Sequence, residues 1–332
     1  MKAVNHRRET AEANALWYVA PGVAELRPQP LSLPGPDQVL VRTLFSGLSR
    51  GTERLVFEGR VPKSEWQRMR GPGQEGDFPF PVKYGYAAVG VVEIGPDALL
   101  GRTVFALHPH QERFVIAADR VAPIPDGVPA RRAVLTANLE TALNILWDGN
   151  AETGQRIVVV GGGLVGLLVV ALAAPMADTE VTLVDIDPAR EELAAKFGAE
   201  FALPKDAPAD ADLVIHTTAS EEGLALALAC AGNEATVVEA SWYGDRKISL
   251  DLGGAFHARR ITLVSSQVGG ISPARRRAQW TNERRLKAAT HLLADDRLDA
   301  LLGEEIPFAE LPSHLSRVLG ANARGVGAYV RY

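Results

Sequence analysis

The sequence has 332 residues, 47% of them hydrophobic and 23% charged, which is typical of a folded, soluble protein with two domains. The formal net charge of −5 argues against a nucleic-acid-binding protein, which would need a basic surface. The single cysteine, Cys230, excludes an intramolecular disulfide and a zinc site made of four thiolates, and it fits a reducing, cytoplasmic location. The N-terminal segment has no apolar core, so we expect no secretory signal.

The first third of the chain predicts a β-rich domain. Short apolar runs alternate with turn-forming stretches such as 33–38 and 123–129, a spacing typical of strands. The strands are expected at 39–45, 89–94, 103–107 and 113–117. The polar segment 60–83 between them predicts a long loop with a short helix near 62–70, as a binding lid or as a disordered stretch.

From about Leu139 helices and strands alternate, which predicts a parallel sheet covered by helices on both faces. Asp187 is suited to cap the helix 188–197, with Gly198 closing it, and Gly232 is suited to close the helix 220–231. The end of the chain predicts a basic helix and a final strand. The other expected elements are helices at 139–148, 164–174 and 273–294 and strands at 157–160, 181–185, 213–217, 235–239 and 261–265.

The apolar run 157–177 is long enough to cross a bilayer, so a membrane span is a rival interpretation of it. Adjacent glycines and Pro175 interrupt the run, however, and they split it into a buried strand and a helix. We therefore expect no membrane-spanning segment.

The turn inside this run fits G-x-G-x-x-G, because its glycines follow an apolar strand and open an apolar helix. Gly161 would allow a tight turn, Gly163 would let the backbone approach a pyrophosphate, and Gly166 would let helix and strand pack closely. Leu164 and Val165 would present unpaired N–H groups and the positive end of the helix dipole to the phosphates. The pattern predicts a dinucleotide site, and its alternative is a glycine turn used only for packing.

Asp185 ends the next expected strand, about 20 residues after Gly166, where a carboxylate can bind both ribose hydroxyls of NAD. A 2′-phosphate at the same place would meet like charge, at a cost of about 4 kcal/mol per pair of unit charges near a protein surface. The sequence therefore predicts NAD(H) as the cofactor and disfavours NADP. Arg190, one helical turn further on, could lie against the adenine or its ribose.

Several segments together resemble the medium-chain dehydrogenase/reductase superfamily over nearly the whole chain. The segment PGPDQVLVRTLFSGLSRGTE (34–53) resembles the N-terminal β segment of that family. GYAAVGVVEIG (85–95) stands where the family usually carries G-H-E-x-x-G-x-V, and PIPDGV (123–128) resembles the entry to its cofactor domain. Within the family, SGLSRGTE is most similar to a zinc-poor branch related to bacteriochlorophyllide hydroxyethyl dehydrogenases.

The resemblance implies an α/β protein in which a Rossmann doubly wound parallel sheet is inserted in a GroES-like, β-rich catalytic domain. The catalytic domain would comprise 1–137 and 271–332, and the Rossmann NAD-binding domain 138–270. The resemblance also implies a small-molecule substrate in the cleft between the domains. Because edge strands of the Rossmann sheet commonly pair in this family, a homodimer is expected.

The family's zinc ligands are replaced in this sequence. Ser49 and Tyr86 stand at two of the ligand places, and the third falls near Thr136 or Ala137. Zinc prefers thiolate or imidazole donors, which serine, threonine and tyrosine do not supply well at neutral pH. We therefore expect that no metal binds at this place and that Tyr86 occupies it.

Without a metal, hydride transfer to a carbonyl needs another group that stabilises the developing oxyanion and supplies a proton. Tyr86 is the leading candidate, with Ser49 and Thr52 beside it; its alternative is an aromatic wall of the pocket. Glu53 matches a family acid that is often structural. Arg50 could reach the pyrophosphate of the cofactor.

Three histidines are further candidates. His108 and His110 alternate on an extended segment, so both could point the same way. They would then be metal ligands, a proton relay or part of an ordinary polar loop. His216 ends the strand 213–217 and could touch the cofactor at the sheet edge, or only cap the strand.

The sequence as a whole predicts a zinc-independent, NAD(H)-dependent oxidoreductase that acts on a secondary alcohol or ketone, or on an activated alkene. Zinc-free relatives that reduce alkenes usually prefer NADPH, so the expected NADH favours alcohol/ketone chemistry. Two alternatives stay open: a non-catalytic NAD(H)-binding sensor or scaffold, and a zinc alcohol dehydrogenase with unusual ligands. The aromatic residues expected to line the substrate pocket, or else to fill the domain interface, are Trp66, Phe78, Phe80, Trp242 and Tyr243.

Overall fold

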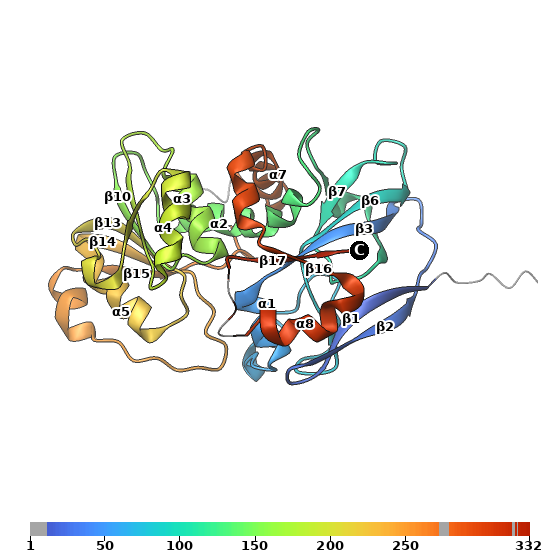
Figure 1. Ribbon diagram of the computed structural model, residues 1–332, viewed down its shortest axis with the longest axis horizontal. Coiled ribbons are helices and arrows are strands. Elements are labelled where there is room, and N and C mark those ends of the chain that lie inside the picture. The colour runs from blue at the N-terminus through green and yellow to red at the C-terminus, as the bar shows by residue number, and fades with distance from the viewer. Residues whose placement is uncertain (1–11, 272–278, 321–322, 324) are drawn as a thin grey trace, which may run out of the picture.

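The computed structural model of the chain describes residues 12–271, 279–320, 323 and 325–332 (Figure 1). These residues form three β-sheets, one of which is purely parallel. The parallel sheet and its helices occupy the left half of the molecule in Figure 1, and the two other sheets occupy the right half.

The parallel sheet has six strands in the order β12-β11-β10-β13-β14-β15, with helices on both faces. Val159 of the central strand joins the apolar core under α2, α3 and α4, whereas its neighbour Val158 joins the core under α5. This alternation buries both faces and produces the doubly wound architecture that the sequence predicts. The bounds are β10 (Arg156–Val160), β11 (Glu180–Val184), β12 (Glu200–Ala202), β13 (Ala211–His216), β14 (Ala231–Glu239), β15 (Thr262–Ser265), α2 (Thr136–Asp148), α3 (Leu164–Ala173), α4 (Glu191–Phe197) and α5 (Glu221–Cys230).

The strand order reverses between β10 and β13, because β11 and β12 lie on one side of β10 and β13 to β15 on the other. In doubly wound sheets such a reversal opens a crevice at the carboxyl ends of the strands, where ligands bind. The glycine turn 161–166 follows β10 at this edge. The fold therefore places the turn at the expected nucleotide position.

The second half of the molecule takes strands from both the first third and the last part of the chain. A seven-stranded sheet has the order β16-β17-β3-β6-β7-β9, with β8 paired to β3, and a four-stranded sheet has the order β2-β1-β5-β4. β17 lies antiparallel to β3, so segments far apart in the sequence complete one sheet. The bounds are β1 (Glu12–Ala20), β2 (Val23–Pro30), β3 (Gln38–Leu48), β4 (Glu75–Gly76), β5 (Val82–Lys83), β6 (Ala88–Ile94), β7 (Thr103–Ala106), β8 (Arg113–Ala117), β9 (Val121–Pro123), β16 (Glu304–Pro307) and β17 (Ala328–Arg331).

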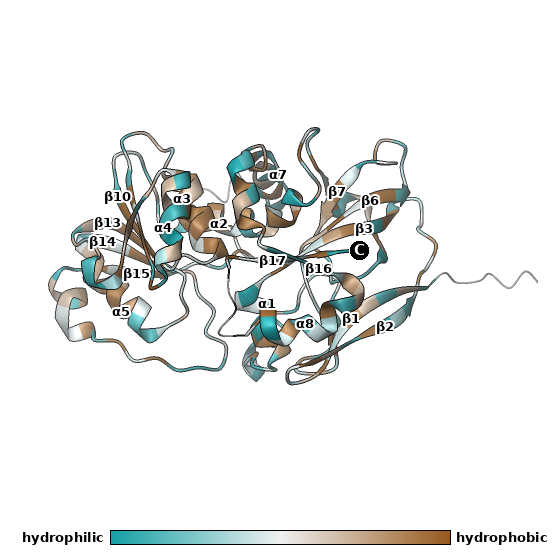
Figure 2. Ribbon diagram, in the orientation of Figure 1, coloured by the Kyte–Doolittle hydropathy of each residue, from teal (hydrophilic) through white to brown (hydrophobic). Residues whose placement is uncertain are grey.

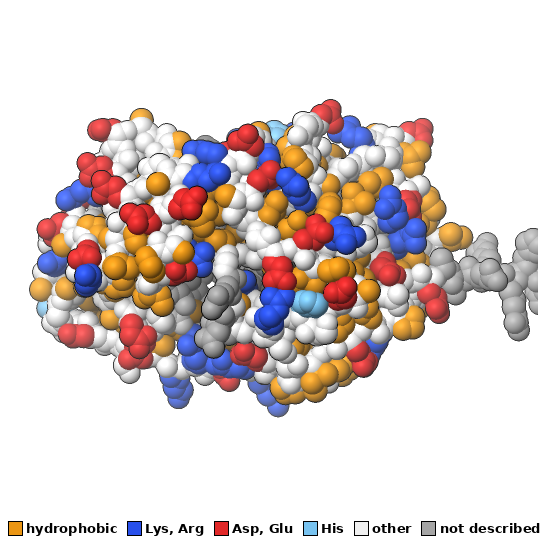
Figure 3. All heavy atoms as spheres, viewed as in Figure 1, with side chains coloured by type: hydrophobic (Ala, Val, Ile, Leu, Met, Phe, Trp, Pro, Cys, Tyr) orange, Lys and Arg blue, Asp and Glu red, His pale blue; other side chains and the backbone are white. Residues whose placement is uncertain are grey.

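Three further helices are α1 (Arg50–Phe57), α7 (Asn282–Leu292) and α8 (Leu311–Val318). α1 follows β3 directly, and α7 packs on α2 between the two halves (Figure 1). Hydrophobic residues follow the strands and the inner helices of both halves (Figure 2). Charges of both signs are mixed over the face seen in Figure 3, so no single-sign patch of the kind that binds nucleic acid covers that face.

In the part of the chain that the structure describes, no helix combines the length and the apolar character that a bilayer span requires. The apolar run 157–177 is divided as predicted, because β10 ends at Val160 and α3 begins at Leu164. Asp187 also caps as predicted by accepting a hydrogen bond from Ala189 N at 3.0 Å, and Gly198 closes α4 with a φ of 86°.

Gly232 does not close a helix, and this expectation is wrong. α5 already ends at Cys230, and β14 begins at Ala231, so Gly232 lies inside a strand. A Cβ atom at Gly232 would lie 3.0 Å from the backbone of Asp210. The glycine therefore serves a close approach between two backbones, which its sequence position after an apolar helix does not reveal.

Two expected helices differ from the structure. In place of a helix near 62–70 there is one 3-10 turn, Lys63–Glu65, beside which the Trp66 indole donates back to Val61 O at 3.0 Å. The basic helix near 273–294 is present as α7, which begins only at Asn282; residues 272–278 lie outside the described residues. The β1–β2 hairpin has a weak sequence signal and was not predicted.

Candidate active site

The turn after β10 requires glycine at two of its positions. Gly161 has a φ of 111°, and a Cβ atom there would lie 2.7 Å from Thr217 Oγ1. A Cβ atom at Gly166 would lie 1.9 Å from Gly161 O, which no real contact allows. These two glycines fix the shape of the turn and its close packing against the helix, in the roles the sequence assigns to them.

Gly163 differs from the other two, because a Cβ atom there would meet nothing within 4 Å. Its φ of −73° is accessible to any residue, so the backbone does not require glycine. The space in front of Gly163 opens onto the first turn of α3, where the N–H groups of Leu164 and Val165 have no partner within the helix. An open helix N-terminus of this kind can accept an anionic group.

Asp185 directly follows β11 and lies beside this turn. Its Oδ2 accepts a hydrogen bond from Gly162 N at 2.5 Å, and its Oδ1 accepts one from Asp187 N at 2.8 Å. The neighbouring Ile186 is 84% exposed, which is unusual for a large apolar side chain. A carboxylate and an exposed apolar side chain therefore stand next to each other at the end of β11.

Arg190 and Arg50 approach one backbone oxygen from the two halves of the molecule. Arg50 Nη1 donates to Gly325 O at 2.7 Å, and Arg190 Nη2 donates to the same oxygen at 3.2 Å. Arg50 Nε also donates to Val318 O, and Arg190 forms an ion pair with Asp187. Burial, followed by the charge of Arg190, lowers the pKa of Arg50. Two positive charges thus lie together where the two halves of the molecule meet.

His216 ends β13 as predicted, but it is fully buried. Its Nδ1 lies 2.8 Å from Glu239 Oε2, and its Nε2 lies 2.6 Å from Thr218 Oγ1. Tyr243 OH donates to the same Glu239 oxygen at 2.9 Å. Protein groups bond to both ring nitrogens of His216, so neither nitrogen is available for the predicted contact with a cofactor.

Tyr86, Ser49 and Thr52 come together, as the sequence suggests. The hydroxyls of Ser49 and Thr52 lie near the Tyr86 phenol. Burial and the charge of Glu53 raise the pKa of Tyr86 to about 12, and the two hydroxyls lower it in part. Tyr86 is therefore protonated at neutral pH and can donate a hydrogen bond.

Gly85 carries the chain over His110 just before Tyr86. Its φ is 126°, and a Cβ atom at this position would lie 2.8 Å from His110 Cδ2. The backbone thus passes against the face of an imidazole, and only glycine leaves room for that approach. The first glycine of GYAAVG is required for the position of Tyr86.

Glu53 lies behind this group as a buried acceptor, which agrees with a structural role. Its Oε2 accepts from Tyr18 OH at 3.0 Å and lies 2.9 Å from His110 Nε2, and its Oε1 accepts from Ser49 N at 2.8 Å. His110 Nδ1 in turn lies 2.7 Å from Ser46 Oγ. Glu53 therefore fixes the position of Ser49, and His110 holds the Glu53 carboxylate in place.

His108 and His110 do not act as a pair. The His108 ring stacks on Phe114 at 3.8 Å, and burial lowers its pKa to about 3. His110 has no exposed surface and bonds to Glu53, so the relay predicted for it has no contact with the surface of the site. The segment 107–110 is not a strand in the structure, and contacts with Phe114 and Glu53 hold the two rings separately.

The donor set does not fit a zinc ion. Among the residues that the structure describes, no three His, Cys, Asp or Glu side chains are grouped so that they could bind a metal. At the expected place, Tyr86 is a neutral phenol, and the Thr136 hydroxyl donates to Ala133 O at 2.6 Å. Ala137 has no donor atom. None of these three side chains supplies the thiolate, imidazole or carboxylate that zinc prefers, and zinc independence stays a prediction.

Four of the five aromatic residues expected at the substrate pocket belong to an apolar core or pack against it. Phe78 is buried in this core, and Trp66, Phe80, Trp242 and Tyr86 pack against it. Trp242 follows β14 of the other half, so its contact crosses the interface between the halves. Tyr243 is not part of this cluster and donates a hydrogen bond to Glu239 instead, so only Trp242 fills the interface between the halves as the alternative expects.

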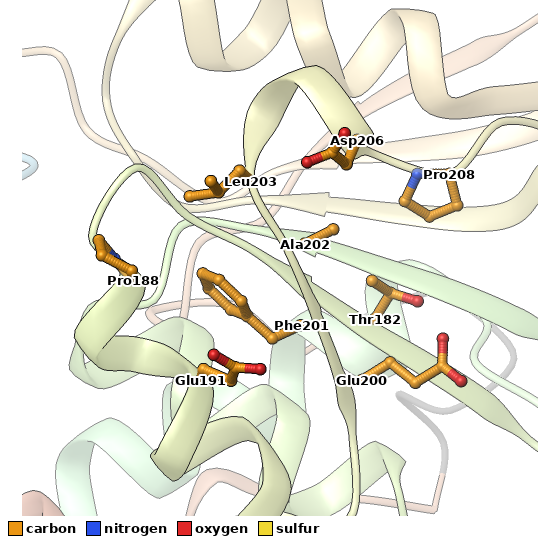
Figure 4. Close-up of a pocket in the computed structure, with 9 residues that line it drawn as sticks. All are labelled: Thr182, Pro188, Glu191, Glu200, Phe201, Ala202, Leu203, Asp206 and Pro208. Carbon is orange, nitrogen blue, oxygen red and sulfur yellow. The ribbon is translucent and has the colours of Figure 1, made fainter.

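A separate hollow of about 410 Å³ lies at the edge of the parallel sheet, between β12 and α4 (Figure 4). Glu191, Glu200 and Asp206 line it. Three carboxylates would repel the phosphates of a dinucleotide. The lining of this hollow therefore disfavours a nucleotide there.

Three further residues at this edge of the sheet are not among the predicted site residues: Ile186, Thr218 and Glu239. Ile186 could have been found as an apolar residue in the loop directly after Asp185, where burial is not expected. Glu239 ends a strand at the carboxyl edge of the sheet, which is a signal of the same kind as that of His216. No sequence signal marks Thr218.

No family model matches the chain. Over 308 residues it is 24% identical to the D-guloside 3-dehydrogenase of Escherichia coli (strain K12), a match that covers 83% of this chain and 87% of that protein. A structure from Sinorhizobium meliloti 1021, described as a zinc-binding dehydrogenase bound to NADP, shares the fold with a TM-score of 0.77 at 19% identity and covers 97% of this chain and 100% of that one. An alcohol dehydrogenase from Escherichia coli CFT073, complexed with NADH, has a TM-score of 0.77 at 15% identity and covers 97% and 99% of the two chains.

Proposed function

Because the chain belongs to the medium-chain dehydrogenase/reductase superfamily, we propose that it is an NAD(H)-dependent, zinc-independent oxidoreductase. Its substrate is a secondary alcohol or the corresponding ketone; an activated alkene is the less favoured class. A sugar or polyol is the first substrate to test, because the matched relative is a guloside dehydrogenase. The observation that carries the proposal is the protonated Tyr86 phenol beside the hydroxyls of Ser49 and Thr52.

The nucleotide end of the site fits a nicotinamide dinucleotide, which would supply or accept the hydride when bound. Gly163, Leu164 and Val165 would face the pyrophosphate, because the space there is open and the N–H groups are available. Asp185 would bind the ribose hydroxyls. Ile186 would lie against the adenine, which explains why so large an apolar side chain is exposed.

The charges around Asp185 favour NAD(H) over NADP(H). A 2′-phosphate would lie against the carboxylate, at a cost of about 4 kcal/mol per pair of unit charges at close range. Arg190 is the counter-argument, because a guanidinium near the ribose can accept a 2′-phosphate. Its ion pair with Asp187 and its bond to Gly325 O direct it elsewhere. Together with Arg50 it is better placed to neutralise the pyrophosphate.

Tyr86 would bind the substrate oxygen and exchange a proton with it. A phenol with a pKa of about 12 remains a donor over the whole physiological range, which suits stabilisation of a developing oxyanion. Ser49 and Thr52 would orient the phenol and pass its proton on. Glu53 and His110 would act only as positioning residues for Ser49.

The proposed domains are 1–137 with 271–332 for catalysis and 138–270 for the cofactor, in a cytoplasmic protein. A homodimer would form by pairing of β15, the edge strand of the parallel sheet. Leu263 on this strand is 36% exposed and Leu252 before it 48%, so an apolar surface flanks the unpaired edge. Light scattering on a Leu263→Lys variant tests this assembly: we expect a dimer for the wild type and a monomer for the variant.

The decisive experiment is transfer of deuterium from labelled NADH to a panel of keto sugars, simple ketones and activated alkenes. We expect label at the carbinol carbon of a ketone product. Tight NADH binding without transfer to any compound would instead identify a sensor or scaffold. Metal analysis of protein purified without chelators is the second arm, and near-stoichiometric zinc at the Tyr86 place would contradict the proposed chemistry.

A further inference from the structure

Arg285 on α7 is buried, with only 3% of its side chain exposed. Its Nε donates to Glu140 Oε1 at 2.9 Å, and its Nη1 donates to Asn144 Oδ1 at 2.6 Å, both on α2. Its remaining bonds go to backbone: Nη1 donates to Gly270 O at 3.0 Å, and Nη2 donates to Val268 O. One side chain thus ties α7, α2 and the loop that follows β15.

The loop 266–270 leaves β15 at the carboxyl edge of the parallel sheet. Gln267, Gly269 and Gly270 are exposed, so apolar packing contributes little to its conformation. Ser266 N fixes its start by donating to the backbone oxygen at the end of β14 at 2.9 Å. Within the loop, Gly269 N donates to Gln267 Oε1 and Gly270 N to Gln267 O, and the bonds from Arg285 attach the loop to the two helices.

An arginine in this position is costly to bury. Removing a guanidinium and a carboxylate from water costs several kcal/mol per ion, and such a pair contributes little net stability. The planar guanidinium group of arginine can donate hydrogen bonds to two carbonyl oxygens and two side chains at once, which neither lysine nor glutamine can do. The arrangement therefore defines one conformation of the loop more than it stabilises the fold.

We propose that Arg285 is a positioning residue that sets the loop 266–270 against the nicotinamide half of the bound dinucleotide. In a doubly wound sheet the dinucleotide spans the switch point. Asp185 after β11 marks the adenosine side, so the nicotinamide side lies toward β13 to β15. The part of this inference that concerns the cofactor rests on the proposed function.

The test compares Arg285→Gln with Arg284→Gln. Arg284 is the neighbour on the same helix, is exposed and stacks over Trp280 at 4.1 Å, so it is a matched control for loss of one arginine. Amide hydrogen exchange of the cofactor-free proteins measures the loop, and fluorescence titration with NADH measures binding. Arg285→Lys, which keeps the charge but not the planar guanidinium group, is the second variant in case the glutamine variant does not fold.

We expect exchange in 266–270 to rise about tenfold or more in Arg285→Gln, as for loss of buried charge-assisted hydrogen bonds. NADH affinity should fall at least about fivefold, Arg285→Lys should be intermediate, and Arg284→Gln should match the wild type. Unchanged exchange in the loop would overturn the inference, as would faster exchange with unchanged NADH binding. If the wild type itself bound no NADH, the proposed function would fail, whereas the exchange comparison would still decide whether Arg285 holds the loop.

Discussion

The glycine turn at 161–166 and the group around Tyr86 are built in different ways. The turn is a local backbone structure, in which the space around Gly161 and Gly166 dictates both residues. The Tyr86 group joins side chains from the start of α1, where Ser49 is the N-cap, and from the segment before β6, and it depends on Gly85 and on the buried Glu53. The shape of the turn therefore depends on free space around the backbone, whereas the arrangement around Tyr86 depends on side chains from separate segments.

The largest effect is expected for Gly166→Ala. The added methyl would lie 1.9 Å from Gly161 O, so the turn must open, at a cost of about 3 kcal/mol or more in unfolding free energy. Thermal unfolding and NADH titration measure the two consequences. Gly163→Ala is the matched control: its methyl meets no protein atom, so stability should hold while NADH affinity falls. Equal losses of stability in both variants would contradict this account of the turn.

Tyr86→Phe should produce the opposite pattern. We expect the hydride-transfer rate to fall about 10²-fold or more, because the proton donor is lost, with NADH affinity and thermal stability nearly unchanged. Tyr84→Phe, the same substitution two residues away, is the control and should keep most of the activity. A fully active Tyr86→Phe enzyme would show that the phenol is only a wall of the pocket.

Asp185→Asn should change cofactor choice more than it changes rate. Removing the negative charge relieves the repulsion of a 2′-phosphate, so the ratio of NADPH to NADH affinity should rise about tenfold to hundredfold. Titration with both cofactors at one salt concentration measures the ratio. Asp187→Asn is the nearby control, and a wild type that already prefers NADPH would refute the role given to Asp185.

The smallest effect is a change of stability at alkaline pH. The pKa of Tyr86 is raised from 10.0 to about 12, so the phenol ionises at a higher pH in the folded protein than in the unfolded chain. Its contribution to stability is therefore complete below about pH 10 and is lost as the pH rises toward 12. Urea unfolding at pH 8 and pH 11 should show a smaller loss for Tyr86→Phe than for the wild type. An equal loss in both proteins would place the titrating group elsewhere.

The doubly wound sheet and the glycine turn could be predicted from the sequence because their signals are local. Strand, glycines, helix and Asp185 follow one another within one stretch of chain, and each has a stereochemical reason. The grouping of Tyr86 with Ser49 and Thr52 came from a resemblance, and local patterns alone do not give it. His110 shows the limit: alternation along the chain suggested a common direction with His108, but contacts with Glu53 and Phe114 decide where each ring points. Gly232 shows the same limit for backbone, because its partner Asp210 is close only in the folded chain.

The carbonyl oxygen of Gly325 is a neutral acceptor shared by Arg50 and Arg190, one from each half of the molecule. A diphosphate is a stronger acceptor for guanidinium groups than a peptide carbonyl is. Occupation of the crevice would turn this neutral junction into an ionic one. The contact between the two halves of the cofactor-bound protein would then weaken as the salt concentration rises.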